Sequence, residues 1–263
     1  MPVSHANGLD IYYESTGAGP PLVMLHALPF DHTLWLYQVA RFSSRFTTIA
    51  MDLRGWGRSA KPVSPFSLED MGNDILGILS DLNITEPVVL LGCSIGSKIS
   101  LMLACDHPER FGAAILVGGN SGPQNFAQRI AAYRENSAAG TLRAFHLSHL
   151  RHGVTQAWAD SAIGRYLLQG FVERGEALDA ESIVQVFRAL ETSDLTPKLA
   201  ECRVPTLIVN GEHDGARPGG ERTASMMKDV EHRILAGTGH CCFLEDPEGF
   251  DELVLSFLAR HCC

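Results

Sequence analysis

The chain has 263 residues, of which 45% are hydrophobic and 19% charged, and its formal net charge is −9 at pH 7. It is long enough to bury a large core, and its acidic balance without a run of lysine and arginine argues against a nucleic-acid partner. Residues 1–10 lack an apolar core and no apolar run approaches a membrane span, so we expect neither a signal peptide nor a membrane anchor. Seven cysteines without a disulfide framework favour a reducing compartment, and we expect a cytoplasmic protein.

Short apolar, β-branched runs alternate with amphipathic segments through the first half of the chain. Strands are expected at residues 8–14, 22–25, 47–51, 88–91 and 113–117, and helices at residues 32–42, 68–82 and 95–107. The second helix follows Ser67 and has acidic residues in its first turn, which is typical of a helix N-terminus. Continuously apolar strands that alternate with helices predict an α/β fold with a mostly parallel sheet.

The alternation stops between residues 123 and 198. This segment shows helical patterns at residues 126–133, 142–150, 158–171 and 182–190, and strands resume at 206–209 and 232–235 with helices near 224–227 and at 247–259. We therefore expect an α/β core formed by residues 1–122 and 199–263. Residues 123–198 would form a helical cap inserted between two strands of the sheet.

A nucleophile motif joins the strand at residues 88–91 to the helix at residues 95–107. Gly92, Ser94 and Gly96 have the G-x-S-x-G spacing of a nucleophile elbow. A serine in a sharp strand-to-helix turn has a strained backbone, and glycine two residues away on either side removes the resulting clashes. The turn also places the hydroxyl at a helix N-terminus, which favours developing negative charge. The motif therefore makes Ser94 the candidate nucleophile.

A candidate acid and a candidate base follow this serine, each directly after a strand. Asp214 follows the strand at residues 206–209, and His240 follows the strand at residues 232–235. A serine nucleophile needs a base, and the base needs a carboxylate that orients it. The carboxyl ends of parallel strands meet at one edge of a sheet. We therefore predict a catalytic triad of Ser94, Asp214 and His240.

With these motifs the chain resembles the α/β-hydrolases, in the branch of bacterial carboxylesterases and 3-oxoadipate enol-lactonases. The segments that carry the resemblance are residues 26–35, 52–59, 92–96, 205–214 and 237–248. They cover both ends of the chain but not the cap. The chain departs from the family pattern at Ala27 and Ser97, where glycine is usual. Both residues are small, so we expect the backbone path to be kept.

The resemblance implies catalysis without a cofactor or a metal. Ser94 would attack the carbonyl carbon, His240 would take the proton, and Asp214 would fix the imidazole tautomer. The backbone N–H groups of Leu28 and Ile95 would form the oxyanion hole. Haloalkane dehalogenases and epoxide hydrolases of this fold have aspartate at the elbow, so Ser94 argues against both activities.

Other polar residues near the motifs have simpler interpretations. Glu212 competes with Asp214 for the role of the acid, but Asp214 occupies the family's position. His26 is expected to be a buried histidine that braces the oxyanion loop, and it is also a candidate substrate-binding residue. An ion-pair and hydrogen-bond cluster beside the site is expected from Asp52, Arg54 and Arg58.

The cysteines near the motifs invite two further hypotheses. Cys93 adjoins the nucleophile, but the elbow exposes only its central residue, so we expect Cys93 to pack as a small apolar group. The His-Cys-Cys runs at residues 240–242 and 261–263 lack the C-x₂₋₄-C spacing of zinc ligands, so no metal site is predicted. Cys262 and Cys263 are expected to form a frayed, oxidisable tail.

The cap contains the remaining candidate substrate-binding residues. Arg143 and His146 could share one helical face, either as an ordinary solvated face or as a cationic wall that holds a substrate carboxylate. Trp158 and Phe126 could belong either to the core of the cap or to the wall of an acyl pocket.

The predicted function is hydrolysis of a small carboxylic ester or lactone through an acyl-enzyme. Three alternatives on the same fold stay open: a carbon–carbon bond hydrolase of a ring-fission product, a cofactor-free perhydrolase, and a non-catalytic ligand-binding receptor. The expected partner is a small-molecule ester or lactone, with no nucleic acid and no membrane. A homo-oligomer is left open, since the sequence does not determine the oligomeric state.

Overall fold

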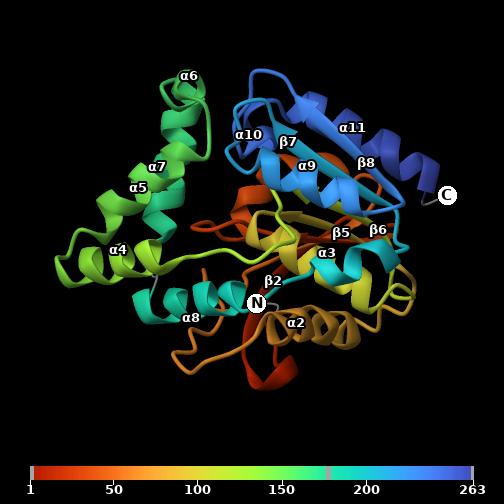
Figure 1. Ribbon diagram of the computed structural model, residues 1–263, viewed down its shortest axis with the longest axis horizontal. Helices are drawn as coiled ribbons and strands as arrows, with labels where there is room; N and C mark the ends of the chain where they lie inside the picture. Colours follow the sequence, from red (N-terminus) through yellow and green to blue (C-terminus); the bar gives the residue numbers. More distant parts are fainter. Residues whose placement is uncertain (1–2, 176–178, 262–263) are drawn as a thin grey trace.

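An eight-stranded sheet forms the centre of the computed structural model, which describes residues 3–175 and 179–261 (Figure 1). The strands are β1 (Val3–Ser4), β2 (Ile11–Thr16), β3 (Pro21–Leu25), β4 (Thr47–Met51), β5 (Val88–Cys93), β6 (Phe111–Val117), β7 (Thr206–Gly211) and β8 (Val230–Leu235). Their order is β1-β2-β4-β3-β5-β6-β7-β8, and only the β1–β2 and β2–β4 pairs are antiparallel. The predicted α/β fold with a mostly parallel sheet is confirmed. The two-residue strand β1 was not predicted, because it is too short to show a period.

Helices cover both faces of this sheet. They are α1 (Leu36–Phe42), which continues the 3₁₀ turn η2 (His32–Trp35), α2 (Leu68–Asp81), α3 (Ile95–Asp106), α9 (Arg217–Met226), α10 (Cys242–Glu245) and α11 (Pro247–His261). One apolar core packs α2, α3 and α9 against one face, and the other packs α1, α10 and α11 against the opposite face. Two further 3₁₀ turns are η1 (Ala6–Gly8) and η3 (Thr196–Glu201). Within the described residues no helix is both long and apolar enough to cross a membrane.

The start of α2 shows how local sequence sets an element boundary. The Ser67 side chain accepts a hydrogen bond from the Asp70 N–H at 3.1 Å, and the Asp70 carboxylate accepts one from the Ser67 N–H at 2.8 Å. This reciprocal capping box satisfies two N–H groups that the helix itself leaves unpaired. The predicted helix start at Ser67 is therefore confirmed.

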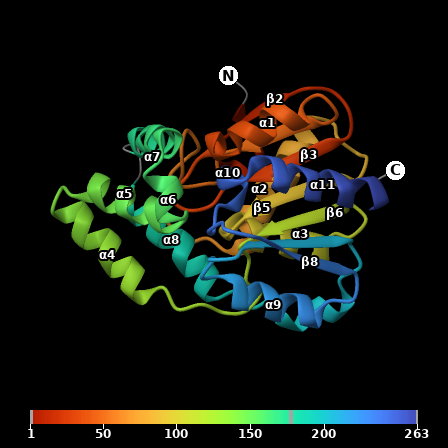
Figure 2. The same ribbon diagram turned by 90° about the horizontal axis from the view of Figure 1, so that it is seen from above.

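Among the described residues, five α-helices lie between β6 and β7 in the sequence, to one side of the sheet in both views (Figure 1, Figure 2). They are α4 (Ala127–Ala138), α5 (Leu142–His152), α6 (Gln156–Ala159), α7 (Ala162–Gly175) and α8 (Ala180–Glu191). Helix α8 packs its apolar side chains into the core beside α2 and α3, whereas α7 packs with the opposite core cluster. The insertion is thus attached to the apolar cores on both faces of the sheet.

The single helix expected at residues 158–171 is instead broken between α6 and α7. Ser161 donates its hydroxyl hydrogen to the Trp158 carbonyl at 2.7 Å and accepts a hydrogen bond from the Gly164 N–H at 3.0 Å. A Cβ at Gly164 would lie only 1.9 Å from the Trp158 carbonyl oxygen. A serine cap and a close backbone approach therefore interrupt a pattern whose apolar period suggested one helix.

Candidate active site

Ser94 stands at the sharp turn between β5 and α3. Its backbone is in the positive-φ region, with φ 54° and ψ −110°, and its N–H donates to the Val117 carbonyl at 2.8 Å. A Cβ at Gly92 would lie 2.3 Å from the Gly96 carbonyl group, and a Cβ at Gly96 would lie 2.2 Å from the Leu25 carbonyl oxygen. Both glycines are therefore sterically required, and together they hold the Ser94 hydroxyl at the helix N-terminus.

Asp214 and His240 form a hydrogen-bonded pair at the same edge of the sheet. Asp214 Oδ1 lies 2.8 Å from His240 Nδ1 and also accepts the Ala216 N–H at 2.8 Å. Burial alone would raise the pKa of Asp214, but its hydrogen bond and charge interaction with His240 hold that pKa below its usual range. Burial lowers the pKa of His240, and the Asp214 carboxylate more than compensates, so the net pKa is raised. The carboxylate thus stabilises a protonated imidazole.

A buried asparagine holds the second oxygen of the Asp214 carboxylate. Asn210, at the end of β7, donates from Nδ2 to Asp214 Oδ2 at 2.7 Å, and its Oδ1 lies 2.9 Å from His232 Nε2. Because the Asn210 amide nitrogen faces a carboxylate, its oxygen must accept the hydrogen that His232 carries on Nε2. Glu212, the competing acid, is exposed and accepts the N–H of Gly237 instead. The geometry pairs Asp214, rather than Glu212, with the histidine.

A cavity of about 620 Å³ contains both Ser94 and His240. Within the described residues the Ser94 hydroxyl makes no direct hydrogen bond to the His240 ring. Such bonds between nucleophile and base are often long in ligand-free enzymes and shorten when substrate binds. The ring lies over Gly118, where a Cβ would be 2.3 Å from His240 Cε1. Leu28 and Ile95 line the same cavity, and Ile95 is the first residue of α3, whose N–H has no partner within the helix. The residues of the predicted triad and oxyanion hole therefore meet at one cavity.

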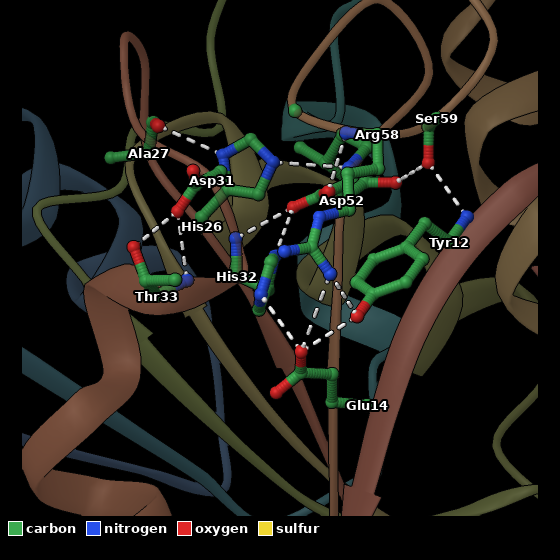
Figure 3. A network of polar contacts seen from close by, with 12 residues as sticks. Tyr12, Glu14, His26, Ala27, Asp31, His32, Thr33, Asp52, Arg58 and Ser59 are labelled. Carbon is green, nitrogen blue, oxygen red and sulfur yellow. Dashed lines mark hydrogen bonds and ion pairs between the residues drawn. The ribbon is translucent and has the colours of Figure 1, made fainter. Parts of the chain in front are cut away.

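A polar network behind the Leu28 loop places His26 (Figure 3). His26 Nε2 accepts the Leu53 N–H at 3.0 Å, so the ring proton is on Nδ1, which donates to the Ala27 carbonyl at 2.9 Å. The ring is fully buried, and burial lowers its pKa. His26 is therefore neutral, and its ring joins the loop at Ala27 to the loop at Leu53. Among the described residues, His26 is not one of those that line the cavity.

Asp52 is the centre of the rest of that network (Figure 3). It accepts the His32 N–H and ring Nδ1–H, both at 2.7 Å, and the Arg58 N–H at 2.8 Å. Arg54, expected in the same cluster, instead forms a separate buried pair with Asp74, with contacts of 2.6 and 2.7 Å. The expected cluster is therefore two clusters, because the Arg54 side chain turns toward α2.

Asp31, His32 and Asp52 lie close enough together to suggest metal ligands. The His32 ring, however, has a carboxylate at each nitrogen, Asp52 at 2.7 Å and Glu14 at 3.3 Å. Burial lowers the pKa of His32, but the hydrogen bond to Asp52 and the negative charges of Asp52, Asp31 and Glu14 together raise it by more, so the net pKa is raised. Two facing carboxylates and a raised pKa favour the doubly protonated His32 ring, which has no lone pair for a metal.

Three of the four cap residues nominated from the sequence lie off the cavity wall. His146 is buried, and burial lowers its pKa to about 4. Arg143 is half exposed and lies 3.9 Å from the Glu173 carboxylate. Trp158 is partly buried against the core that contains α7. Among the described residues that line the cavity none of these three occurs, whereas Phe126 does.

On the cap side, the cavity is lined mostly by residues that the sequence did not nominate. The cavity wall on the cap side includes Phe126, itself one of the nominated residues, together with Arg129, His149, His152 and Leu190. His149 and His152 belong to the same run as Arg143 and His146 but lie on another face of α5. A helical period could have found that face, but only the docking of α5 shows which face meets the cavity.

Lys98 was missed altogether, although it is the one lysine in a mostly apolar helix. It lies one turn after the nucleophile on α3 and is 2% exposed. Its ammonium donates to the carbonyls of Gly122 at 2.9 Å and Ser193 at 2.8 Å, where the chain leaves the sheet for the cap and returns from it. Burial lowers the pKa of Lys98 to about 8.

A second connection joins the histidine loop to the cap. Glu245 accepts the Gly239 N–H at 2.7 Å and the Thr155 N–H at 3.0 Å, while the Cys241 N–H donates to the Gly153 carbonyl at 2.7 Å. The loop that carries His240 is thus bonded to the turn between α5 and α6.

The cysteines near the site are buried. Cys93 and Cys242 have their pKa raised well above the usual range by burial, so both thiols stay protonated. Cys93 packs in the apolar core, as expected. Cys262 and Cys263, the expected frayed tail, lie outside the described residues.

The alpha/beta hydrolase fold family matches the chain over residues 20–247. The chain is similar to the 3-oxoadipate enol-lactonase 2 of Acinetobacter baylyi, with 25% identity over 281 residues and 99% of each chain covered. It is also similar to a 2-hydroxy-6-oxononadienedioate/2-hydroxy-6-oxononatrienedioate hydrolase of Escherichia coli, with 29% identity over 279 residues, covering 96% of this chain and 92% of the relative. The crystal structure of the enol-lactonase from Burkholderia xenovorans has the same fold, with a TM-score of 0.90 at 23% identity and coverage of 98% of this chain and 100% of that one. The resemblance to the α/β-hydrolases is confirmed, and two of these similar proteins are named enol-lactonases.

Proposed function

The chain belongs to the alpha/beta hydrolase family, and we propose that it is a serine hydrolase that cleaves small carboxylic esters or lactones through an acyl-enzyme. One observation carries the proposal. Ser94, held at positive φ on a helix N-terminus, shares a cavity with a His240 ring that is hydrogen-bonded to Asp214. A hydroxyl, an imidazole and a buried carboxylate in this arrangement are what acyl transfer requires.

In the proposed reaction Ser94 Oγ forms a bond to the carbonyl carbon while His240 Nε2 takes the hydroxyl proton. Asp214 keeps the proton of the other ring nitrogen in place and stabilises the imidazolium. The oxyanion would accept hydrogen bonds from the N–H groups of Ile95 and Leu28, each worth about 3 kcal/mol in the transition state. His240 then gives its proton to the leaving oxygen, and water releases the acid by the same steps.

The relatives support the ester or lactone class and favour one second candidate. The Acinetobacter relative is named for the lactone of 3-oxoadipate. The Escherichia coli relative is a hydrolase of a hydroxy-oxo dienedioate, which favours hydrolysis of a ring-fission product at a carbon–carbon bond as the alternative. Both reactions would use the same serine and histidine, so they differ in substrate rather than in the position of the nucleophile.

Replacing the nucleophile tests the proposal directly. Ser94→Ala should lower turnover of p-nitrophenyl acetate by about 10⁴-fold or more and abolish labelling by a fluorophosphonate, with the thermal unfolding midpoint unchanged. A screen of esters, lactones and ring-fission acids with the same variant as control separates the two candidates. Hydrolysis that survives in Ser94→Ala would contradict the assignment of the nucleophile.

A further inference from the structure

The loop that carries the proposed base lies between the core and the cap. This base loop (residues 237–241) is held on its core side by the loop after β7, where the His213 N–H donates to the Thr238 carbonyl at 2.9 Å. On its other side it meets the cap turn (residues 153–155), which joins α5 to α6. The position of His240 therefore depends on the cap as well as on the sheet.

One carboxylate joins the base loop to the cap turn, with one oxygen for each. Glu245 Oε1 accepts the Gly239 N–H at 2.7 Å, and Glu245 Oε2 accepts both the Thr155 N–H, at 3.0 Å, and the hydrogen of the Thr155 hydroxyl. Among the described residues Glu245 forms no ion pair, so these donors are what holds its carboxylate. Only a carboxylate accepts on both sides in this way, because an amide would turn its NH₂ group toward one of the N–H donors.

The backbones of the base loop and the cap turn are also in close contact. The Cys241 N–H donates to the Gly153 carbonyl at 2.7 Å, and a Cβ at Gly239 would lie 3.1 Å from the Val154 backbone. His240 is thus flanked in the chain by two residues that both touch the cap turn. A shift of the cap turn is therefore passed to the imidazole through a single neighbouring residue on either side.

The cap turn is also connected to the space that a substrate occupies. Helix α5 ends at His152 and leads directly into the cap turn, and His149, His152 and Gly153 line the cavity. Among the described residues no hydrogen bond joins Ser94 to His240, so proton transfer requires the two side chains to come closer. A misplacement of about 1 Å can lower a catalytic rate roughly 100-fold. A substrate that contacts α5 is therefore in a position to set the alignment of base and nucleophile.

We propose that Glu245 is a positioning residue, whose carboxylate ties the base loop to the cap turn so that a cap in contact with substrate aligns His240 with Ser94. The inference rests on the proposed hydrolase function, because it concerns how the base of that reaction is placed. Glu245 is not among the described residues that line the cavity, so it acts through His240 and not on the substrate. Its loss should therefore lower kcat and leave KM nearly unchanged.

Removing one side of the Glu245 bridge tests this role, with all rates measured well below the thermal unfolding midpoints. Glu245→Gln should lower kcat for p-nitrophenyl butyrate roughly 10-fold, change KM by less than about twofold, and slow fluorophosphonate labelling of Ser94 by a factor similar to that on kcat. Thr155→Val, which removes only the hydroxyl of the cap turn, should lower kcat about threefold. Because both substitutions act on one bridge, the double variant should stay about 10-fold below wild type, whereas independent effects would give about 30-fold.

Two substitutions in the same part of the cap are matched controls. Thr155→Ser keeps the hydroxyl and should retain kcat within about twofold of wild type. Ser161→Ala removes a hydroxyl that bonds the Trp158 carbonyl and the Gly164 N–H but not Glu245, so it should lower the thermal midpoint and not kcat.

Two results would overturn the positioning role of Glu245. One is a lower thermal midpoint of Glu245→Gln with unchanged kcat and labelling rate, and the other is a double variant whose losses multiply to about 30-fold. If Glu245→Gln does not fold, equal kcat in Thr155→Val and Thr155→Ser would overturn the role instead. These results leave the hydrolase proposal standing as long as Ser94→Ala abolishes labelling. Wild-type protein that neither hydrolyses the ester nor is labelled would overturn both proposals.

Discussion

The sheet edge and the cap differ in how their polar groups are partnered. At the sheet edge every proposed catalytic group is held by a strand end or a buried donor: Ser94 by its elbow, Asp214 by Asn210, and His240 by Asp214. On the cap wall, Arg129 lines the cavity and forms no ion pair with any residue that the structure describes. Catalytic groups that strand ends and buried donors hold in place suit bond breaking, whereas a cation facing the cavity suits selection of the substrate. The comparison predicts that substitutions at the edge lower kcat and that substitutions on the wall change selectivity.

The largest effect after loss of the nucleophile is expected at the acid. Asp214→Asn should lower kcat by about 10⁴-fold, because the imidazole loses its orienting carboxylate. Asp214 raises the pKa of His240, so its removal lowers that pKa. The acid limb of any residual kcat/KM profile should therefore move to lower pH. An unmoved limb would show that this carboxylate does not act on the base.

A smaller loss of kcat is expected when Asn210, which donates a hydrogen bond to Asp214, is replaced. Asn210→Leu removes the donor at 2.7 Å from Asp214 Oδ2 and should lower kcat roughly 10-fold with KM unchanged. His232→Leu should cost less, because His232 acts on the carboxylate only through Asn210. Steady-state kinetics on a neutral ester measure both effects. A change confined to KM would place Asn210 outside the positioning of the acid.

Lys98→Met tests the connection between the two regions. The variant leaves two backbone carbonyls without their donor, so the thermal midpoint should fall by several degrees at neutral pH. The pKa of Lys98 is lowered to about 8 in the folded protein, so between pH 8 and about 10 the unfolded chain binds the extra proton. The contribution of Lys98 to the free energy of unfolding therefore rises between pH 8 and about pH 10. The gap in midpoint between wild type and Lys98→Met should widen from pH 8 to pH 10.

The smallest effect is expected at Arg143. Its side chain lies beside Glu173 and not on the cavity wall, so Arg143→Ala should change the preference for acidic over neutral esters by less than about twofold. Measuring that ratio beside Arg129→Gln compares two cap arginines directly. A larger effect at Arg143 than at Arg129 would show that Arg143, and not Arg129, acts on the substrate from the cap.

The predictions that succeeded concern segments whose geometry is set locally. The strands and the elbow follow from the period of apolar residues or from glycines that admit one backbone path, and the start of α2 follows from Ser67 and the acidic residues after it. The helix predicted across residues 158–171 failed because a serine cap and a carbonyl contact at Gly164 override its apolar period. Lys98 was missed because a lysine in a helix is ordinarily solvated, and only the approach of both cap connections supplies carbonyls to it.

The sequence by itself determined the fold class, the order of the strands and helices, and the candidate residues Ser94, Asp214 and His240. It could do so because strand ends, tight turns and glycine spacing constrain the chain over a few residues. Only the tertiary structure decided that Arg129, rather than Arg143, faces the cavity, and that Lys98 joins the nucleophile helix to the cap. Those outcomes depend on how helices far apart in the chain dock on one another, and the period of a single helix does not contain that orientation.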